Sequence, residues 1–317
     1  MRVVIPGGSG QVGTILARAL HRDGHHVVVL SRAPTRAPWR VVSWDVATSG
    51  DWVQEVDGAD VVVNLAGRSV NCRYTAGNLE KILRSRLDST RAVGSAIARA
   101  SRPPRVWLQA STATIYAHRY DAPNDEASGI IGGGEPDVPA YWAFSIRVAR
   151  EWEQALAEAD TPRTRRVALR SAMVMSPDGG GIFDTLLTLA RRGLGGRAGS
   201  GRQFMSWVHE HDFVKAVYWL IDNNAIDGAV NISSPNPLPQ AEFMRILRRA
   251  AGVPIGLPAA TWMLEIGAFF MRTDTELVLK SRRVIPGRLL ESGFRFRFPD
   301  WPAAADDLVA RWRASVR

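Results

Sequence analysis

Residues 1–110 alternate short apolar runs with longer amphipathic stretches. The runs expected to form strands are Val3–Ile5, His26–Leu30, Arg40–Ser43, Val61–Asn64 and Val106–Gln109. Most of them are continuously apolar rather than alternating, as in a parallel sheet whose two faces are both covered by helices. Apolar residues from Val12 to Leu20 recur at the spacing of one helix face, and Gly24 is placed to end that helix. The pattern predicts an α/β fold with a right-handed, doubly wound parallel sheet of the Rossmann type.

The second half of the chain has a less regular pattern. A polar, glycine-rich loop over His118–Pro139 precedes a helix that we expect from about Tyr141 to Ala159. Two further apolar runs, Arg166–Met175 and Ala229–Ile232, are expected to extend the sheet. The stretch Gly179–Gly201 is dense in glycine and is expected to lie outside the sheet.

A length of 317 residues exceeds the usual size of a single core, so two structural parts are expected. The first is a Rossmann domain over residues 1–175, completed by about 205–233. The second is a smaller C-terminal or substrate domain, formed by residues 176–204 and 234–317.

The net charge of +9 raises the question of a nucleic-acid partner. The basic residues are almost all arginines, with lysine only at Lys81, Lys215 and Lys280, and they are scattered along the chain. We therefore expect no nucleic-acid partner, although a ligand with a phosphate group would benefit from the positive charge.

The cysteine content and the apolar segments bear on location. Cys72 is the only cysteine, which excludes an intrachain disulfide and fits a reducing compartment. The N-terminal apolar stretch Val3–Ile5 is interrupted by Pro6, unlike a signal peptide. The longest apolar segment, Leu257–Met271, is shorter than a membrane span and contains Glu265, so it is interpreted as a buried helix. A cytoplasmic protein without a membrane partner is expected.

A glycine-rich loop within Val3–Gly13 is the strongest chemical signal. It follows a strand and opens an amphipathic helix, which is the context required of a dinucleotide-binding loop. Glycine is needed where backbone N–H groups approach a pyrophosphate and where the helix packs on the sheet. The helix N-terminus adds N–H donors and a favourable dipole for the anion. The residues expected here are Gly7, Gly10, Gln11, Val12 and Gly13.

The end of the second strand indicates which cofactor is bound. An NAD site usually has an acidic residue there for the ribose 2′-hydroxyl, whereas this chain has Ser31 and Arg32. A guanidinium and a hydroxyl suit a 2′-phosphate, so NADP(H) is favoured. The alternative is that Arg32 simply faces solvent.

Two later segments are also expected to contact the cofactor. Asp45 follows the third strand and is a candidate partner of the adenine, or else an ordinary surface acid. The sequence Asn-Leu-Ala-Gly at 64–67 ends the fourth strand, at the edge where open α/β sheets bind ligands. Small side chains there allow the backbone to lie against the cofactor, which makes Leu65, Ala66 and Gly67 candidate cofactor contacts.

These segments, with Ser-Thr-Ala-Thr-Ile-Tyr at 111–116, resemble the extended short-chain dehydrogenases/reductases. The resemblance is greatest to an atypical, epimerase-like subfamily with an appended C-terminal domain. Further matching segments are Ser85-Arg86, Ser176–Gly180, Gly199–Gln203, Trp207–His209, Ser234–Pro237, Val284–Pro286 and Glu291–Phe294. The resemblance implies a Rossmann fold with NADP(H), and it adds Arg86 to the residues that line the cofactor site.

The resemblance also implies catalysis by a Ser or Thr, a Tyr, and a Lys four residues after the Tyr, which lowers the pKa of the tyrosine. Thr112 falls on the first position. Ser145, rather than lysine, stands four residues after Tyr141. Arg147 is a candidate replacement, but six residues separate it from Tyr141, roughly 240° around a helix. Tyr116 is another phenol near the sheet edge. The alternative that neither tyrosine is catalytic stays open.

His209, His211 and Asp212 lie close together in the sequence. Their spacing, without a third histidine nearby, argues against a metal site. The resemblance instead suggests that His209 and Asp212 belong to a turn that ties the substrate domain to the Rossmann core.

Three functions are compatible with this sequence. The first is an NADP(H)-dependent oxidoreductase that acts on a small carbonyl or alcohol substrate. The second is a nucleotide-sugar epimerase or dehydratase, which the absent Tyr/Lys pair disfavours. The third is a non-catalytic NADP(H)-binding sensor or regulatory protein. Neither the substrate nor the oligomeric state is specified by the sequence, and an oligomer is compatible with it.

Overall fold

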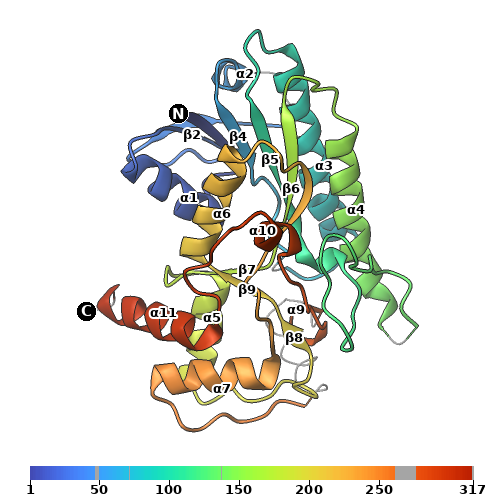
Figure 1. Cartoon of the computed structure of the whole chain (residues 1–317), viewed down its shortest axis with the longest axis vertical. Helices are drawn as coiled ribbons and strands as arrows, with labels where there is room; N and C mark the ends of the chain where they lie inside the picture. Colours follow the sequence, from blue (N-terminus) through green and yellow to red (C-terminus); the bar gives the residue numbers. More distant parts are fainter. Residues whose placement is uncertain (47–49, 71, 137, 261–275, 316–317) are drawn as a thin grey trace.

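The computed structural model describes residues 1–46, 50–70, 72–136, 138–260 and 276–315. The apolar runs form a seven-stranded sheet in the order β10-β6-β5-β4-β1-β2-β3, and all its strands pair in parallel (Figure 1). The predicted α/β, doubly wound fold class is therefore confirmed. The strands are β1 Arg2–Pro6, β2 His26–Ser31, β3 Arg40–Ser43, β4 Val61–Asn64, β5 Val106–Thr112, β6 Arg165–Ser171 and β10 Gly228–Ile232.

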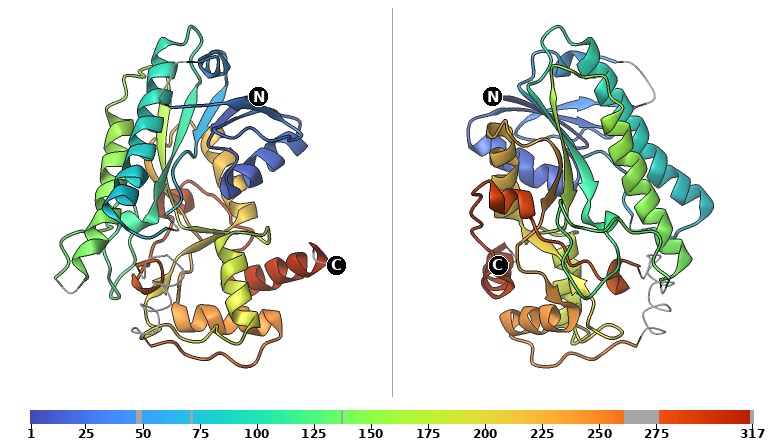
Figure 2. Two further views of the ribbon diagram at one scale, coloured as in Figure 1. Left: turned by 180° about the vertical axis from the view of Figure 1, so that it is seen from behind. Right: turned by 45° about the vertical axis from the view of Figure 1, so that its right-hand side comes forward.

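Helices cover both faces of this sheet, which explains why its strands are continuously apolar. The long helices α3 (Ala76–Arg99) and α4 (Ala143–Ala157) run side by side along one face (Figure 2). The other face carries α1 (Gln11–Arg22) and α6 (Glu210–Asp222). Successive residues of a strand therefore enter two cores. Val3 packs in a cluster with residues of α1 and α6, whereas the next residue along β1 packs in a cluster with α3.

A second group of elements lies below the sheet in Figure 1, around an apolar cluster of its own. Phe183, Phe243 and Trp301 are buried members of that cluster. The helices of this group are α5 Ile182–Arg191, α7 Gln240–Ala251 and α11 Trp301–Ser315, and its strand pairs are β7 Met173–Met175 with β9 Trp207–His209 and β8 Phe204–Met205 with β11 Leu238–Pro239. The short helix α9 spans Glu276–Leu279, and α10 Gly287–Glu291 packs on β10 of the large sheet. The division of the chain into two domains stays a prediction.

Two sequence-based expectations differ from the structure in detail. The run Arg166–Met175 is two strands, because the chain leaves the large sheet after β6 and β7 pairs with β9 instead. The helix expected from Tyr141 begins as a 3-10 turn over Ala140–Trp142 and continues as α4. Most of the helix expected over Leu257–Met271 lies outside the described residues. Within the described part of the chain, no helix is both long and apolar enough to cross a bilayer.

Candidate cofactor and active site

The glycine loop between β1 and α1 leaves no room for side chains at two of its positions. Gly7 has φ of +74°, and a Cβ on it would lie 2.6 Å from the Cα of Ala66. A Cβ on Gly13 would lie 2.5 Å from the Cα of Gly8. The first contact presses the loop against the end of β4, and the second packs the start of α1 against the loop itself. Both close approaches require glycine.

The N-terminus of α1 is suited to an anion. Gly10 is the N-cap and has no side chain to occupy the N–H groups of the first turn. That turn, from Gln11 to Thr14, contains no acidic residue that would repel a phosphate. The loop therefore fits the pyrophosphate of a dinucleotide, as the sequence predicts.

Ser31 and Arg32 lie beside the glycine loop at the end of β2. Ser31 is buried, with its Oγ 2.9 Å from Oγ of Ser9 and 3.3 Å from the backbone N of Ala33. Ser31 thus ties the end of β2 to the glycine loop. Arg32 is exposed at this edge, within reach of solvent or of a ligand. Asp45 is exposed one residue after Trp44, whose backbone N donates to the carbonyl of Ser31 at 2.9 Å.

The Leu65–Gly67 segment is supported from behind by Arg86. The Nη1 of Arg86 donates to the carbonyls of Arg68 and Ile82 at 3.1 and 2.9 Å. A Cβ on Gly67 would lie 3.3 Å from Cζ of Arg86, so the guanidinium lies directly against the backbone of this turn. Burial lowers the pKa of Arg86 to about 10. Arg86 is thus placed to hold the turn at Leu65–Gly67 in its conformation.

A cavity of about 320 Å³ lies where the carboxyl end of the sheet meets the glycine loop and α5. Its walls are mostly apolar, as expected of a pocket for a nicotinamide ring and a small substrate. Gln11 and Val12 of α1, Leu65 and Ser111 all line it, so the structure brings predicted cofactor residues next to the end of β5. The other lining residues are Ala110, Leu169, Ser171, Ala172, Val174, Ile182 and Phe213.

The glycine before α5 brings that helix close to the cavity. A Cβ on Gly181, the N-cap of α5, would lie 1.7 Å from Nε2 of Gln11. Any larger residue would displace the Gln11 side chain from its place at the cavity wall. The glycine-dense stretch thus contributes a structural contact to the candidate site.

Thr112 ends β5 next to Ser111 of the cavity wall. Its Oγ1 accepts a hydrogen bond from the backbone N of Thr114 at 3.1 Å, which caps the following 3-10 turn over Ala113–Ile115. Ser111 Oγ donates to Oε1 of Glu153 at 2.6 Å. The Thr112 hydroxyl is therefore held at the carboxyl end of β5.

Tyr116 is held inside the protein. Its hydroxyl donates to Oδ1 of Asn231 at 3.0 Å and accepts from Nη1 of Arg170 at 2.9 Å. Burial raises the pKa of Tyr116. These contacts describe a structural phenol rather than a proton donor to a substrate.

Tyr141 and Arg147 are not among the residues that line the 320 Å³ cavity. Tyr141 lies in the 3-10 turn before α4 and is 46% exposed. Nε of Arg147 lies 3.7 Å from Oε1 of Glu151, and its guanidinium is 5.4 Å from the ring centre of Phe144. The side chain of Arg147 is 59% exposed. Thr112 is likewise not among the residues that line the cavity, but it directly follows Ser111, which does, whereas Tyr141 and Arg147 lie at the surface.

Three charged residues near the site were not predicted from the sequence. Nζ of Lys280 donates to the carbonyl of Thr114 at 2.9 Å and lies 3.6 Å from Oε1 of Glu276. Nε of Arg282 donates to Oγ1 of Thr114 at 3.1 Å. Lys280 and Glu276 are buried and Arg282 is half-buried, and Oε2 of Glu276 accepts from Oγ of Ser145 at 2.6 Å. The sequence feature that could have drawn attention to Lys280 is the rarity of lysine in a chain whose basic residues are nearly all arginine.

His209 and Asp212 join the C-terminal elements to α6. Nε2 of His209 lies 3.1 Å from Oδ2 of Asp307 in α11, and the carboxylate of Asp212 accepts from the backbone N of Arg297 and of Phe298 at 2.7 and 2.8 Å. This is the kind of tie that the family resemblance suggests. Burial lowers the pKa of His209 to about 3. No cluster of three potential metal ligands occurs among the described residues.

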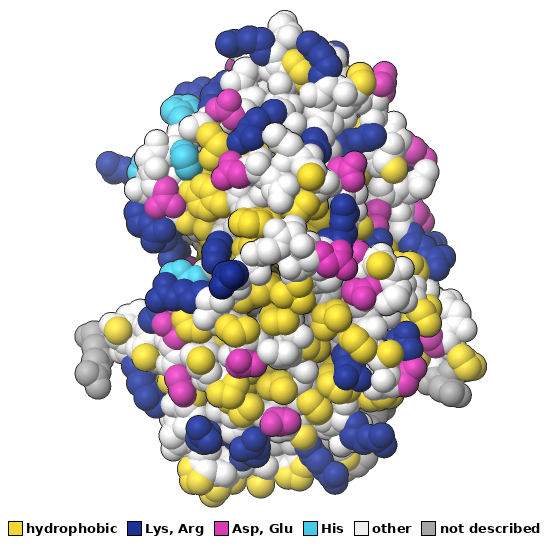
Figure 3. Space-filling view, in the orientation of Figure 1, with side chains coloured by type: hydrophobic (Ala, Val, Ile, Leu, Met, Phe, Trp, Pro, Cys, Tyr) yellow, Lys and Arg dark blue, Asp and Glu magenta, His cyan; other side chains and the backbone are white. Residues whose placement is uncertain are grey.

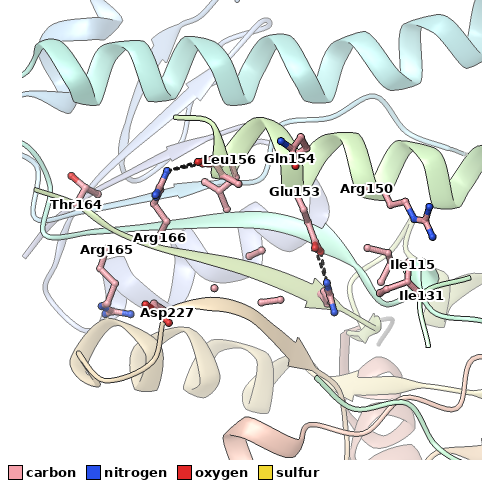
Figure 4. Close-up of a pocket in the computed structure, with 15 residues that line it drawn as sticks. Ile115, Ile131, Arg150, Glu153, Gln154, Leu156, Thr164, Arg165, Arg166 and Asp227 are labelled. Carbon is pink, nitrogen blue, oxygen red and sulfur yellow. Dashed lines mark hydrogen bonds and ion pairs between the residues drawn. The ribbon is translucent and has the colours of Figure 1, made fainter. Parts of the chain in front are cut away.

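A larger cavity, of about 850 Å³, lies elsewhere, between α4 and the strands β6 and β10 (Figure 4). Its charged groups are engaged within the protein. Glu153 pairs with Arg170 at 2.7 Å, and Nη1 of Arg166 donates to the carbonyl of Leu156 at 3.1 Å. Among the described residues that line this cavity there is none from the glycine loop. This cavity therefore does not adjoin the predicted cofactor loop.

The surface charge is distributed rather than concentrated. On the face shown in Figure 3, Lys and Arg side chains are scattered among acidic and neutral ones over both halves of the molecule. This face offers no continuous basic stripe of the kind that follows a nucleic-acid backbone.

Comparison with known proteins adds family information to this geometry. Residues 3–233 match the model of the NAD dependent epimerase/dehydratase family, and residues 259–308 match a domain of unknown function, DUF1731. The chain is 34% identical to the epimerase family protein SDR39U1 of Bos taurus, over 98% of this chain and 100% of that protein. It is 30% identical to the epimerase family protein YfhF of Bacillus subtilis, over 98% of each.

Two solved structures are also similar over nearly the whole chain. Human SDR39U1, crystallised with NADPH, has a TM-score of 0.85 and 31% identity, covering 98% of this chain and 99% of that one. A nucleoside-diphosphate sugar epimerase from Corynebacterium glutamicum has a TM-score of 0.75 and 28% identity, covering 98% of this chain and 58% of that one.

Proposed function

The chain belongs to the NAD dependent epimerase/dehydratase family, and from this premise we propose that it is an NADP(H)-dependent oxidoreductase acting on a small carbonyl or alcohol substrate. The observation that carries the proposal is the 320 Å³ apolar cavity at the sheet edge, where Gln11 and Val12 of the cofactor loop lie next to Ser111 and the end of β5. A nicotinamide in this cavity would lie beside Thr112.

The cofactor would be held mainly by backbone groups and one guanidinium. The N–H groups at the start of α1, after Gly7 and Gly10, would bind the pyrophosphate, with Gly13 packing that helix close. Ser31 and Arg32 would face the 2′-phosphate, and the crystallisation of human SDR39U1 with NADPH supports this choice of cofactor. The remaining cofactor contacts that we propose are Asp45 at the adenine and Leu65, Ala66 and Gly67 on the nicotinamide side, with Arg86 behind them.

The nicotinamide, when bound, supplies hydride transfer, and the chain's own residues supply position and a proton. The Thr112 hydroxyl lies at the end of β5, where it would donate a hydrogen bond to the substrate oxygen. The largely apolar wall excludes water from the reacting atoms. Tyr141 and Arg147 are the further candidates for the proton path and, being exposed, would act from the rim.

Two measurements test the proposal in sequence. Calorimetric titration of the purified full chain with NADPH and NADH should show tighter binding of NADPH, and no binding of either would overturn the proposal. NADPH oxidation is then followed with a panel of aldehydes, ketones and quinones. Thr112→Val should lower turnover by about 100-fold, while Thr112→Ser, which keeps the hydroxyl, should retain most of it. Equal losses in the two variants would remove Thr112 from the chemistry.

A non-catalytic NADP(H) sensor is the second candidate. It is favoured by the absence of a lysine four residues after Tyr141, where Ser145 stands and is hydrogen-bonded to Glu276. Tight NADPH binding without turnover of any panel compound, together with a partner protein retained only in the presence of NADPH, would support it.

A nucleotide-sugar epimerase or dehydratase is the third candidate. Its support is the similarity to the sugar epimerase of Corynebacterium glutamicum. Binding of a UDP- or GDP-sugar by the chain, with cofactor retained through purification, would favour it over the other two.

A further inference from the structure

The position of the missing lysine is linked to another lysine of the chain. Ser145 stands four residues after Tyr141, and its Oγ donates to Oε2 of Glu276 at 2.6 Å. The other carboxylate oxygen of Glu276 lies 3.6 Å from Nζ of Lys280. One buried carboxylate therefore separates the place where the family has its lysine from the ammonium group of Lys280.

We propose that Lys280, supplied by the C-terminal segment, is the positioning lysine of this active site and replaces the lysine that the family has on the helix after the tyrosine. This inference rests on the proposed oxidoreductase function. Lys280 would act through the turn after Thr112 and through Glu276, placing a positive charge beside the group that hydrogen-bonds the substrate oxygen.

The contacts of Lys280 support a role at the end of β5. Its Nζ donates to the carbonyl of Thr114 at 2.9 Å, and the hydroxyl of the same threonine accepts from Nε of Arg282 at 3.1 Å. The backbone N of Thr114 in turn donates to Oγ1 of Thr112 at 3.1 Å. Lys280 and the hydroxyl of Thr112 therefore both contact Thr114, Lys280 at its carbonyl and Thr112 at its backbone N, and Thr112 directly follows Ser111 of the cavity wall.

The surroundings of Lys280 explain why its charge can matter here. Its side chain and that of Glu276 are each only 1% exposed, so water screens the charge weakly. The titratable and charged groups that face it are Glu276, Arg282, Glu135 and His118. Glu135 belongs to the loop before α4, and its carboxylate accepts from the backbone N of His118 at 2.8 Å.

The protonation of Lys280 is poised near neutral pH. Burial lowers the pKa of Lys280 to about 8, against the opposing attraction of Glu276. The ammonium form is present below that pH and is lost as the pH rises through it. An ordinary lysine would remain charged across this range.

The competing explanation is a purely structural Lys–Glu pair in the interior. The two explanations differ in their response to the charge of the cofactor. The nicotinamide ring of NADP⁺ carries a positive charge that NADPH lacks, and a lysine next to the active site would experience that difference. An interior pair remote from the ring would not.

Because the chain has only three lysines, the signal of each can be followed separately. The full chain is prepared with lysine labelled with ¹³C at Cε, which gives signals from Lys81, Lys215 and Lys280. Lys81→Arg and Lys215→Arg assign them. The Lys280 signal should titrate near pH 8, and its pKa should be lower by about half a unit or more with NADP⁺ than with NADPH. The signals of Lys81 and Lys215 should be the same in both complexes.

Equal titration of Lys280 in the two complexes would overturn the inference while leaving NADP(H) binding intact. No binding of either cofactor would instead overturn the proposed function itself. The two failures are thus distinguishable.

Variants provide a second readout. Lys280→Met should lower turnover by about 100-fold with NADPH affinity within about twofold, and should abolish the loss of activity above pH 8. Lys280→Arg, which keeps the charge, should recover part of the turnover, and Lys215→Met is the matched control. Circular dichroism identifies a misfolded variant, in which case the ¹³C titration of the unmutated chain decides. Full turnover in folded Lys280→Met would overturn the inference.

Discussion

The cofactor end and the catalytic end of this sheet edge are built in different ways. At the cofactor end, the important residues follow the strands directly, as in the loop Gly7–Gly13 and in the pair Ser31-Arg32. At the catalytic end, contacts join distant parts of the chain. Ser145 and Glu276 are 131 residues apart, and Thr114 and Lys280 are 166 residues apart.

The difference follows from what each chemistry requires. A pyrophosphate is bound by several backbone N–H groups at once, so the path of the main chain itself is constrained and few sequences satisfy it. A proton donor needs one suitably placed charge or hydroxyl, which any element that reaches the site can supply. The first requirement leaves a sequence motif, whereas the second is visible only in the folded chain.

The largest effect is expected from a change in the cofactor loop. Gly7→Ala would place a Cβ 2.6 Å from Ala66 backbone atoms on a residue with φ of +74°. Left-handed strain and overpacking together should cost about 2–5 kcal/mol of unfolding free energy and lower NADPH affinity at least about 100-fold. Urea unfolding and calorimetry measure both.

Gly77→Ala is the matched control for that variant. Gly77 lies in the first turn of α3, and no heavy atom lies within 4 Å of its added Cβ. The control should keep wild-type affinity and stability. Wild-type NADPH binding by folded Gly7→Ala would contradict the assignment of this loop to the cofactor.

A smaller effect is expected at the cofactor's 2′-phosphate. Arg32→Ala should lower the affinity for NADPH about 10- to 100-fold, because it removes hydrogen bonds to a charged phosphate. The affinity for NADH should change by no more than about twofold. Arg99→Ala removes another exposed arginine, at the end of α3, and should change neither affinity. Equal losses for NADPH and NADH in Arg32→Ala would show that Arg32 does not select the cofactor.

Much of the fold and the cofactor loop could be predicted from the sequence because their signals are local. The bounds of β3 and β4 match the expected runs, and β4 is buried throughout and apolar up to Asn64, as expected of a parallel strand covered on both faces. The break between β6 and β7 was missed because a single residue, Ala172, separates the two strands, and only their pairing partners differ. Periodicity does not carry that information.

The catalytic end was only partly predictable for a physical reason. Thr112 was identified because the segment 111–116 resembles the family's Ser/Thr motif. Lys280 and Glu276 follow no motif, and their importance comes from burial against Thr114 and Ser145, which depends on how the C-terminal segment folds back. Comparison of the two phenols also needed the structure, which shows Tyr116 buried and Tyr141 exposed.

A moderate effect should separate those two phenols. Tyr116→Phe removes a hydroxyl that accepts from Arg170 and donates to Asn231. Leaving these buried partners unsatisfied should lower the unfolding free energy by about 1–2 kcal/mol without changing turnover per folded molecule. Tyr141→Phe is the matched change at an exposed phenol and should leave stability unchanged. A loss of turnover in folded Tyr116→Phe would make it, rather than Tyr141, the phenol of the active site.

The smallest effect is expected at the junction that holds the C-terminal elements, and with them Lys280, against the sheet. Burial lowers the pKa of His209 to about 3, with His211, Asp307 and Arg311 around it. Neutral His209 therefore stabilises the fold fully above its unfolded pKa of about 6.5, and this contribution is lost as the pH falls from there towards 3. Between pH 7.5 and 5.5, the loss should be about 1 kcal/mol of unfolding free energy.

His209→Gln should remove this part of the pH dependence in urea unfolding, whereas His26→Gln at an exposed histidine should not. An unchanged pH dependence in His209→Gln would mean that the junction is held by Asp212 and its backbone donors instead.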